Sequence, residues 1–261
     1  MGFALAGAFL ELGCRVTLAG RSEGSTQEAC RRILAEQPTA ADRLSGCACD
    51  VSNTSQLEAL WAHAAALAPV DVWINNAGVS PSFGKLWELS AEELRDTIDT
   101  NVNGVLLGSW VAIRGMRAQS RGTIYNIVGF GADGTTYPGT LAYGASKRAV
   151  AYVTKSLTQA AQGTPVRVCT LDPCAVRTEM TAITWGALAA QKPIVGVMID
   201  SLALDPPEAA RLLAPRVLAN KRSGVLVRPW SAGMFWLRTL TLPVFALLRL
   251  PGAKPKGTPT P

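Results

Sequence analysis

The sequence is poor in metal-binding residues: it has one histidine, His63, and its six cysteines include no CxxC pair. This excludes a zinc site of the usual ligand spacing, so we predict no metal and reduced thiols. Charged residues are only 17% of the 261, and the net charge of +6 comes from Lys and Arg residues that stand singly or in pairs. Such dispersed charge is not typical of nucleic-acid binding, and we predict none. No basic segment of the kind that begins a secretory signal opens the sequence, so we predict that the protein is not secreted.

Hydrophobic residues make up 48% of the chain, which excludes a disordered protein and fits one α/β domain. Apolar periodicity alternates between helices and strands along the sequence. It predicts helices over 2–12, 25–37, 54–68, 90–119, 143–162 and 207–219, and strands over 15–19, 44–49, 70–74, 123–128, 166–171 and 224–227. This order is typical of a doubly wound parallel sheet, in which ligands bind beyond the carboxyl ends of the strands.

Tyr143 and Lys147 are the residues whose spacing points most directly to chemistry. Four residues apart at the start of a helix, they share one helical face. We expect the ammonium group to lower the pKa of the phenol, which is normally near 10. A tyrosine tuned in this way can exchange a proton with a substrate oxygen near neutral pH. Taken alone, the spacing also occurs by chance in Tyr–Lys pairs on helix surfaces.

Four other motifs accompany this pair. Asn75-Asn76-Ala77-Gly78 follows one predicted strand, and Asp50-Val51 follows the strand before it. Asn101-Val102-Asn103-Gly104 lies in the long predicted helix, and the segment from Pro173 to Thr178 follows the strand after Tyr143. In spacing and order, residues 2–230 resemble the short-chain dehydrogenase/reductase family. A turn that only caps a helix is the alternative reading of Asn75–Gly78.

The resemblance implies a Rossmann-like fold and a hydride transfer that uses a nicotinamide cofactor. It implies that Tyr143 is the catalytic acid or base, that Lys147 is its partner and a ribose ligand, and that Asn101 holds a water of the proton relay. Asp50 matches the residue that binds adenine, Pro173 packs against the nicotinamide, and Thr178 binds phosphate or the nicotinamide amide. The cofactor-binding residues that we predict are Gly2, Arg21, Asp50, Val51, Asn76, Ala77, Gly78, Tyr143, Lys147, Pro173 and Thr178.

The tip of the strand at 15–19 indicates which cofactor is preferred. An acidic residue there would bind the ribose 2′-hydroxyl of NAD(H), whereas an arginine accommodates the 2′-phosphate of NADP(H). The sequence has no acid at this tip and has Arg21 immediately after it. We therefore predict that NADP(H) is preferred over NAD(H). The alternative is that Arg21 is only a solvated turn residue.

One departure from the family concerns the catalytic serine. Family members carry serine after the strand that corresponds to 123–128, where this sequence has Val128-Gly129. Thr135, Thr136 or Thr140 could replace the missing hydroxyl, or the substrate does not require it.

The same stretch contains glycines at 129, 131 and 134 in a literal GxGxxG pattern. We do not interpret it as a dinucleotide fingerprint, because the residues after it do not begin a helix. The glycines, the hydroxyl residues after them and Pro138 instead resemble the chlorophyll b reductases of the non-yellow-coloring type, as do residues 207–217. That resemblance implies reduction of the formyl group of a chlorin with NADPH. Another bulky apolar carbonyl compound fits equally well.

A second departure concerns the first strand of the fold. In the family, a central strand and a glycine-rich turn precede the first helix, and only Gly2 matches the end of that turn. Without this strand, 15–19 and 70–74 each lose a neighbour, at about 1–3 kcal/mol per buried unpaired backbone group. We therefore expect Met1 to be an internal methionine of a longer protein.

We predict a domain over 1–229, an apolar C-terminal segment over 230–250 and a disordered tail over 251–261. Within the domain, 179–206 is expected to form an apolar lid over the substrate, although ordinary core packing explains its composition as well. The segment 230–250 contains Pro243 and Arg238, so we predict a peripheral membrane contact or a subunit contact rather than a membrane span.

The sequence thus predicts an NADP(H)-dependent oxidoreductase that acts on a bulky apolar small molecule, with a chlorin as one candidate. Two alternatives remain open: a catalytically impaired scaffold or regulatory protein of the same fold, and a steroid- or lipid-type dehydrogenase. The resemblance also implies a homo-oligomer. The expected location is the cytoplasm, or the stroma or membrane surface of a plastid if the source is a photosynthetic eukaryote.

Overall fold

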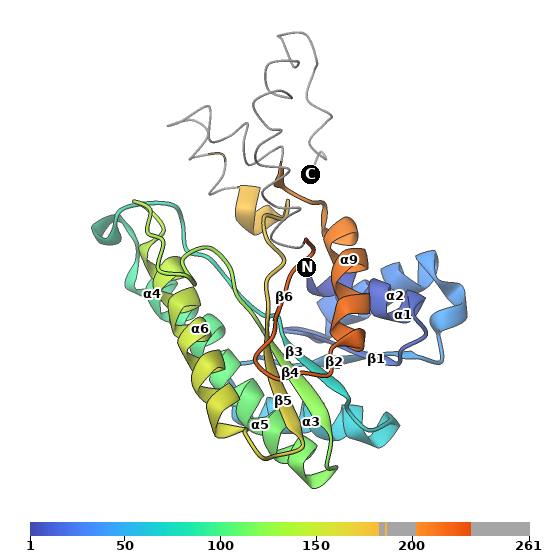
Figure 1. The fold of residues 1–261 in the computed structure, drawn as a ribbon. Coiled ribbons are helices and arrows are strands. Elements are labelled where there is room, and N and C mark those ends of the chain that lie inside the picture. Colours follow the sequence, from blue (N-terminus) through green and yellow to red (C-terminus); the bar gives the residue numbers. More distant parts are fainter. Residues whose placement is uncertain (183–185, 187–201, 231–261) are drawn as a thin grey trace.

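The computed structural model describes residues 1–182, 186 and 202–230 (Figure 1). The helices are α1 (Gly2–Glu11), α2 (Glu23–Glu36), α3 (Thr54–Leu67), α4 (Ala91–Ile98), α5 (Gly104–Ala118), α6 (Leu141–Ala160) and α9 (Pro206–Ala219). The strands are β1 (Val16–Gly20), β2 (Leu44–Ala48), β3 (Val72–Asn75), β4 (Gly122–Ile127), β5 (Val166–Leu171) and β6 (Leu226–Val227). Most boundaries lie within two residues of the sequence prediction.

All paired strands are parallel, in the orders β1-β2 and β3-β4-β5-β6. Helices cover both faces of the strands, with α1, α2 and α9 on one side and α4, α5 and α6 on the other (Figure 1). This arrangement confirms the predicted α/β class with a Rossmann-like parallel sheet. In such a sheet the side chains at strand ends converge on one edge, which positions the site.

The alternation of side chains along β4 divides the core into two layers. Tyr125 packs with Phe9 of α1 and Leu213 of α9. Its neighbour Ile124 points to the opposite face, where it packs with Met116 of α5. Both β4 residues have no exposed surface. Because successive side chains of a strand point to opposite faces, one short strand anchors the helices of both layers.

The sheet is divided between β1 and β3. Among the described residues, β1 pairs only with β2, and β3 pairs with β4 and no other strand. The residues of both open edges line one large cavity, together with α1 and α3. The division agrees with the prediction that the strands near 15–19 and 70–74 lack a neighbour.

The predicted helix over 90–119 is not continuous. A π-helical segment, Asp99–Asn103, separates α4 from α5, and the buried Asn101 lies within it. Such single-turn π segments are frequent at functional sites. Apolar periodicity alone did not reveal this one, because α4 and α5 follow one another along the same helical path.

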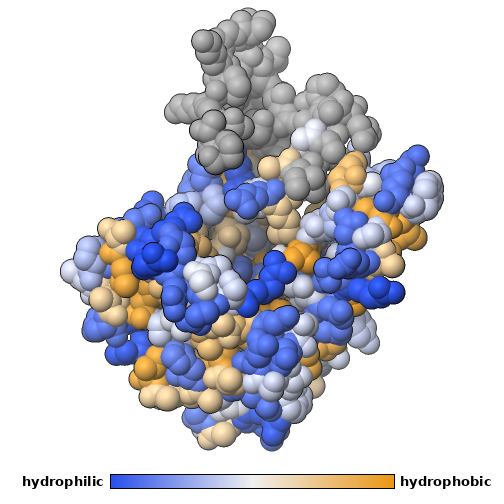
Figure 2. All heavy atoms as spheres, turned by 180° about the vertical axis from the view of Figure 1, so that it is seen from behind, coloured by the Kyte–Doolittle hydropathy of each residue, from blue (hydrophilic) through white to orange (hydrophobic). Residues whose placement is uncertain are grey.

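Several predicted features lie outside the described residues. Of the predicted lid at 179–206, the structure describes residues 179–182, 186 and 202–206. Of the predicted C-terminal segment at 230–250 it describes Trp230, and the predicted tail at 251–261 lies outside the described residues. No helix among the described residues is long and apolar enough to cross a membrane. On the face drawn in Figure 2, hydrophobic side chains gather in separate patches between hydrophilic ones.

Candidate active site

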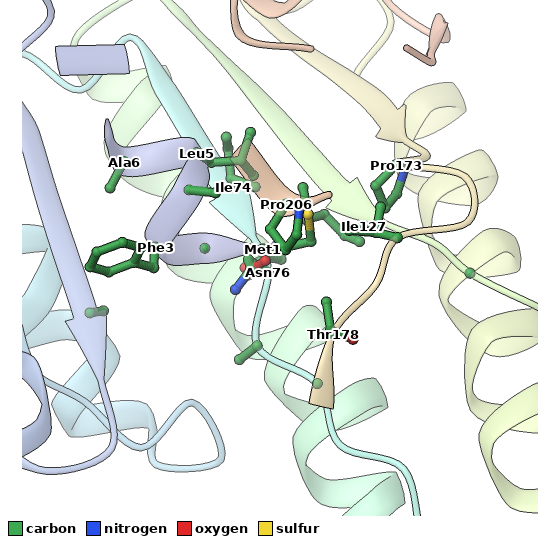
Figure 3. Close-up of a pocket in the computed structure, with 18 of the residues that line it drawn as sticks. Met1, Phe3, Leu5, Ala6, Ile74, Asn76, Ile127, Pro173, Thr178 and Pro206 are labelled. Atoms are coloured by element: carbon green, nitrogen blue, oxygen red, sulfur yellow. The ribbon is translucent and has the colours of Figure 1, made fainter. Parts of the chain in front are cut away.

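One cavity of about 2170 Å³ collects the predicted cofactor residues. It runs from the open strand edges to the carboxyl ends of β1, β3, β4 and β5 and the start of α1. Figure 3 shows Asn76, Pro173 and Thr178 around it, with Met1 and Phe3 from the start of the chain. The predicted residues that line it are Gly2, Arg21, Asp50, Val51, Asn76, Ala77, Gly78, Tyr143, Lys147, Pro173 and Thr178. Asn101 is completely buried.

Helix α6 places Tyr143 and Lys147 on one face of its first two turns. The Lys147 Nζ atom lies 5.7 Å from the centre of the Tyr143 ring. The same nitrogen donates a hydrogen bond of 3.2 Å to the carbonyl oxygen of Ile127 at the end of β4. Lys147 is only 4% exposed. Within the described residues its ammonium group makes this one hydrogen bond, which leaves two N–H donors.

The expected lowering of the Tyr143 pKa is wrong for this arrangement. Burial, followed by the nearby Asp172 carboxylate, raises the pKa of the phenol to about 12. Burial also lowers the pKa of Lys147 to about 8. The two side chains lie together as their spacing predicted, but the predicted direction of the phenol's pKa shift is wrong, because desolvation opposes the charged form of each group.

Asn101 connects two segments of the site through its amide group. Its Oδ1 atom accepts a hydrogen bond of 2.8 Å from the Val79 backbone N–H, and its Nδ2 atom donates to the Val79 carbonyl oxygen and to Ser146 Oγ. Ser146 in turn donates to the carbonyl oxygen of Tyr143. The side chain therefore ties the loop after Gly78 to the helix that carries Tyr143. Its predicted part in holding a water remains a prediction.

Gly129 occupies the place where the family has serine, and the structure leaves no room there for a side chain. A Cβ atom added to Gly129 would lie 2.6 Å from the Tyr143 hydroxyl oxygen. Among the threonines considered as substitutes, Thr140 donates to the Tyr137 carbonyl oxygen, and Thr135 bonds to Asp133. Thr136 is exposed. The replacement of the serine by one of these hydroxyls remains a hypothesis.

The loop from Gly129 to Thr140 contains turns and begins no helix before Leu141. The three glycines therefore do not form a pyrophosphate-binding turn of the usual kind, because such a turn leads directly into a helix N-terminus.

Asp50 and Arg21 line the cavity just after the carboxyl ends of β2 and β1. Two hydrogen bonds from Ser52 lower the pKa of Asp50, and the Arg21 cation lowers it further. Both Ser52 bonds use Asp50 Oδ1, which leaves Oδ2 available to a ligand. Within the part of the chain that is described, the Arg21 guanidinium is exposed and forms no ion pair.

Gly2 and Gly78 line the cavity at positions where a side chain would come unusually close to neighbouring polar groups. A Cβ atom on Gly2 would lie 2.6 Å from the Asn76 amide nitrogen. A Cβ atom on Gly78 would lie 3.3 Å from Asn101 Oδ1 and 3.5 Å from Lys147 Nζ. A side chain at either position would crowd the polar groups that the cavity presents. Nearby, Thr178 forms a reciprocal set of hydrogen bonds with Thr181.

Asp172 is the site residue that sequence reasoning missed. Its Oδ1 atom accepts from the Cys174 backbone N–H at 2.9 Å, and its Oδ2 atom accepts from Arg228 Nε at 2.8 Å. The first bond shapes a turn in which Cys174 has a positive φ of 60°. The sequence shows that Asp172 directly follows β5. Its contact with Arg228 could not be predicted, because it depends on the pairing of β6 with β5.

The sequence matches the short chain dehydrogenase family over residues 1–186. The chain therefore belongs to the short-chain dehydrogenases, a family of oxidoreductases, as its motifs predicted.

Chlorophyll(ide) b reductases are among its most similar relatives. The chloroplastic reductase NOL of Arabidopsis thaliana is 35% identical over 230 residues, which cover 86% of this chain and 64% of that protein. The probable chlorophyll(ide) b reductase NYC1 of the same plant is 31% identical over 242 residues, 87% of this chain and 48% of the relative. The chain thus spans about half to two thirds of the length of these proteins, and its resemblance to this branch is confirmed.

A solved structure of another short-chain oxidoreductase is similar in fold. A metagenomic short-chain oxidoreductase in complex with NADP is 26% identical, with a TM-score of 0.66, and the match covers 88% of this chain and 92% of that one.

Proposed function

We propose that this protein is an NADP(H)-dependent oxidoreductase that reduces the formyl group of a chlorophyll b-type chlorin to a hydroxymethyl group. The observation that carries the proposal is the placement of Tyr143 and Lys147 on one helical face, beside Gly78 and Asn76 in a single cavity. The names of the most similar relatives support the choice of a chlorin.

The residues of the cavity fit a dinucleotide. The buried Lys147 ammonium group has two N–H donors left for ribose hydroxyls, and the absence of a side chain at Gly78 keeps the approach to it open. The first turn of α1, at Gly2, has backbone N–H groups without helical partners, which suits a pyrophosphate. Asp50 Oδ2 is available to an adenine amino group, while Pro173 and Thr178 border the nicotinamide end.

The residues named above would hold the nicotinamide cofactor, which would supply a hydride to the formyl carbon. The π electrons of the carbonyl bond move to its oxygen, and Tyr143 Oη transfers a proton to that oxygen, so that an aldehyde becomes a primary alcohol. A phenol with a pKa of about 12 keeps its proton at neutral pH, as the proton donor in a reduction must. Lys147 is positively charged below its pKa of about 8 and offsets the negative charge left on the phenolate.

Arg21 supports NADP(H) as the preferred cofactor. It lines the cavity at the end of β1, where an acidic residue would otherwise bind a ribose 2′-hydroxyl. Its guanidinium group lies close enough to Asp50 to lower the pKa of that carboxyl group. An NADP(H) molecule whose adenine contacts Asp50 would place its 2′-phosphate beside Arg21.

The direct test is to incubate the purified protein with chlorophyllide b and either NADPH or NADH, and to follow the hydroxymethyl product by chromatography. We expect product with NADPH and a lower kcat/KM with NADH. A parallel reaction with a steroid ketone tests the alternative substrate class. Reduction of the ketone without reduction of chlorophyllide b would contradict the choice of substrate, and absence of NADPH binding would favour the scaffold.

We expect Gly129→Ala and Gly129→Ser to lower kcat/KM by about 10- to 100-fold, although serine restores the residue typical of the family. The added Cβ atom would lie 2.6 Å from the Tyr143 hydroxyl oxygen and must displace it, and displacements of about 1 Å at a reacting group cost up to about 100-fold. Steady-state kinetics with chlorophyllide b measure the effect.

Gly144→Ala is the matched control, because its Cβ atom would lie in ordinary van der Waals contact, 3.9 Å from Gly131 Cα on the facing loop. It is expected to keep the activity. If Gly129→Ser were more active than the unmodified protein, the steric explanation for the missing serine would be wrong.

Plastid location is part of the proposal, and the chloroplastic names of the relatives support it. The homo-oligomer stays a prediction; an apolar groove between α5 and α6, lined by Leu106, Trp110 and Tyr152, lies on the outer face of these helices. Contact with a membrane through 230–250 also stays a prediction.

A further inference from the structure

Two loops of the active-site cavity meet through aromatic side chains. One loop follows Gly78, and the other precedes Tyr143. Phe83 from the first loop and Tyr137 from the second have ring centres 6.4 Å apart, with 37° between the ring planes. Both rings are partly buried, and both line the same cavity as Tyr143. Phe83 thus lies on the loop that follows the proposed cofactor residue Gly78, and Tyr137 lies on the loop that leads to the proposed proton donor Tyr143.

Backbone contacts hold the two loops together. The Gly84 N–H donates a hydrogen bond of 3.4 Å to the Gly139 carbonyl oxygen. The Phe83 ring packs directly against Gly139, since a Cβ atom there would lie 2.7–2.9 Å from three ring carbons. Gly139 also has a positive φ of 88°, a conformation that favours glycine. The position of Phe83 therefore depends on a residue only four positions before Tyr143.

Glu93 anchors the first loop from its other side. Its Oε1 atom accepts hydrogen bonds from the backbone N–H and the hydroxyl of Ser82, at 3.0 and 2.7 Å. Its Oε2 atom accepts from the backbone N–H and the hydroxyl of Ser90, at the N-terminus of α4. These bonds lower the pKa of Glu93 to about 2, so its carboxylate stays charged at neutral pH. Phe83, next to Ser82, is thereby fixed between α4 and the second loop.

We propose that Phe83 and Tyr137 form an aromatic wall that determines specificity by packing against the face of a flat, conjugated substrate. This inference rests on the proposed function and deepens it. Aromatic side chains favour offset or tilted contact with other π systems, and a fixed pair loses little conformational freedom on binding. A small aliphatic aldehyde has no conjugated face to use the wall, so the two residues would select for ring systems such as a chlorin.

The test compares Phe83→Leu and Tyr137→Leu, which keep apolar side chains but remove the rings. Pheophorbide a serves as the probe, because it has the flat macrocycle and no formyl group, so its binding requires no hydride transfer. We expect each variant to raise its Kd by about 3- to 10-fold, measured by the shift of its Soret absorption band. The Kd for NADPH, measured by fluorescence, should be unchanged, and the KM for chlorophyllide b should rise more than kcat changes.

Trp87→Leu is the matched control, since Trp87 lies near Phe83 in sequence, is 80% exposed and does not line the cavity. It should bind pheophorbide a as the unmodified protein does. The wall is refuted if the unmodified protein fails to bind pheophorbide a, if neither leucine variant weakens that binding, or if NADPH binding falls equally. Weaker pheophorbide binding in both variants, without any reduction of chlorophyllide b, would support the wall and overturn the proposed reaction.

Discussion

Tyr143→Phe is expected to lower the rate of chlorin reduction by about 10²- to 10⁴-fold, the usual size of a lost general acid. The change removes only the hydroxyl oxygen that would protonate the substrate. Within the described residues that hydroxyl forms no hydrogen bond with the protein, so its loss leaves no partner unsatisfied. The variant should therefore remain folded and should bind NADPH as before. Single-turnover reduction of chlorophyllide b, followed by chromatography, measures the change.

Tyr152→Phe provides the control for this experiment. Tyr152 lies on the same helix, is 74% exposed and does not line the active-site cavity. Its activity should equal that of the unmodified protein. If Tyr143→Phe reduced the chlorin at an undiminished rate, another group would have to supply the proton, and the assignment of the acid would be abandoned.

Lys147→Met is expected to abolish most activity and yet to stabilise the protein at neutral pH. Burial lowers the pKa of Lys147 to about 8 from 10.5, which corresponds to a cost of about 3 kcal/mol for keeping the group charged at pH 7. The lost hydrogen bond from the charged ammonium group to Ile127 offsets about 2 kcal/mol of this. The free energy of unfolding should thus rise by about 1 kcal/mol, as denaturant unfolding at pH 7 can measure.

The pH dependence of this gain follows from the direction of the pKa shift. Between about pH 8 and pH 10.5 the unfolded chain binds a proton at Lys147 that the folded chain has released. The stability of the unmodified protein therefore rises with pH in this window, relative to the variant. The advantage of Lys147→Met should be complete below about pH 8, and above about pH 10.5 the variant should be the less stable protein, because the cost of the buried charge is gone while the hydrogen bond to Ile127 is still missing. An advantage that persists at high pH would show that packing, and not charge burial, is its cause.

The elements themselves were largely determined by local sequence. Apolar residues marked the strand Val166–Leu171 at its observed limits, because Val166, Val168, Cys169 and Leu171 are buried there between the helical layers. The four-residue interval between Tyr143 and Lys147 placed both on one face of α6, because that spacing is a property of any helix. The π-helical segment around Asn101 escaped this reasoning, since α4 and α5 follow one helical path; the bonds of Asn101 to Val79 and Ser146 join segments far apart in the sequence.

The sequence by itself thus determined the family, the parallel fold and the predicted cofactor residues that line the cavity, because these depend on motifs and periodicities a few residues long. Only the tertiary structure decided how those residues behave. The pKa of Tyr143 rises through burial and through Asp172, which follows a different strand. Gly129 lacks a side chain because the Tyr143 hydroxyl fills its space, and Phe83 meets Tyr137 where two separate loops cross. Desolvation, steric exclusion and ring contact all arise between segments far apart in the chain, so no local pattern encodes them.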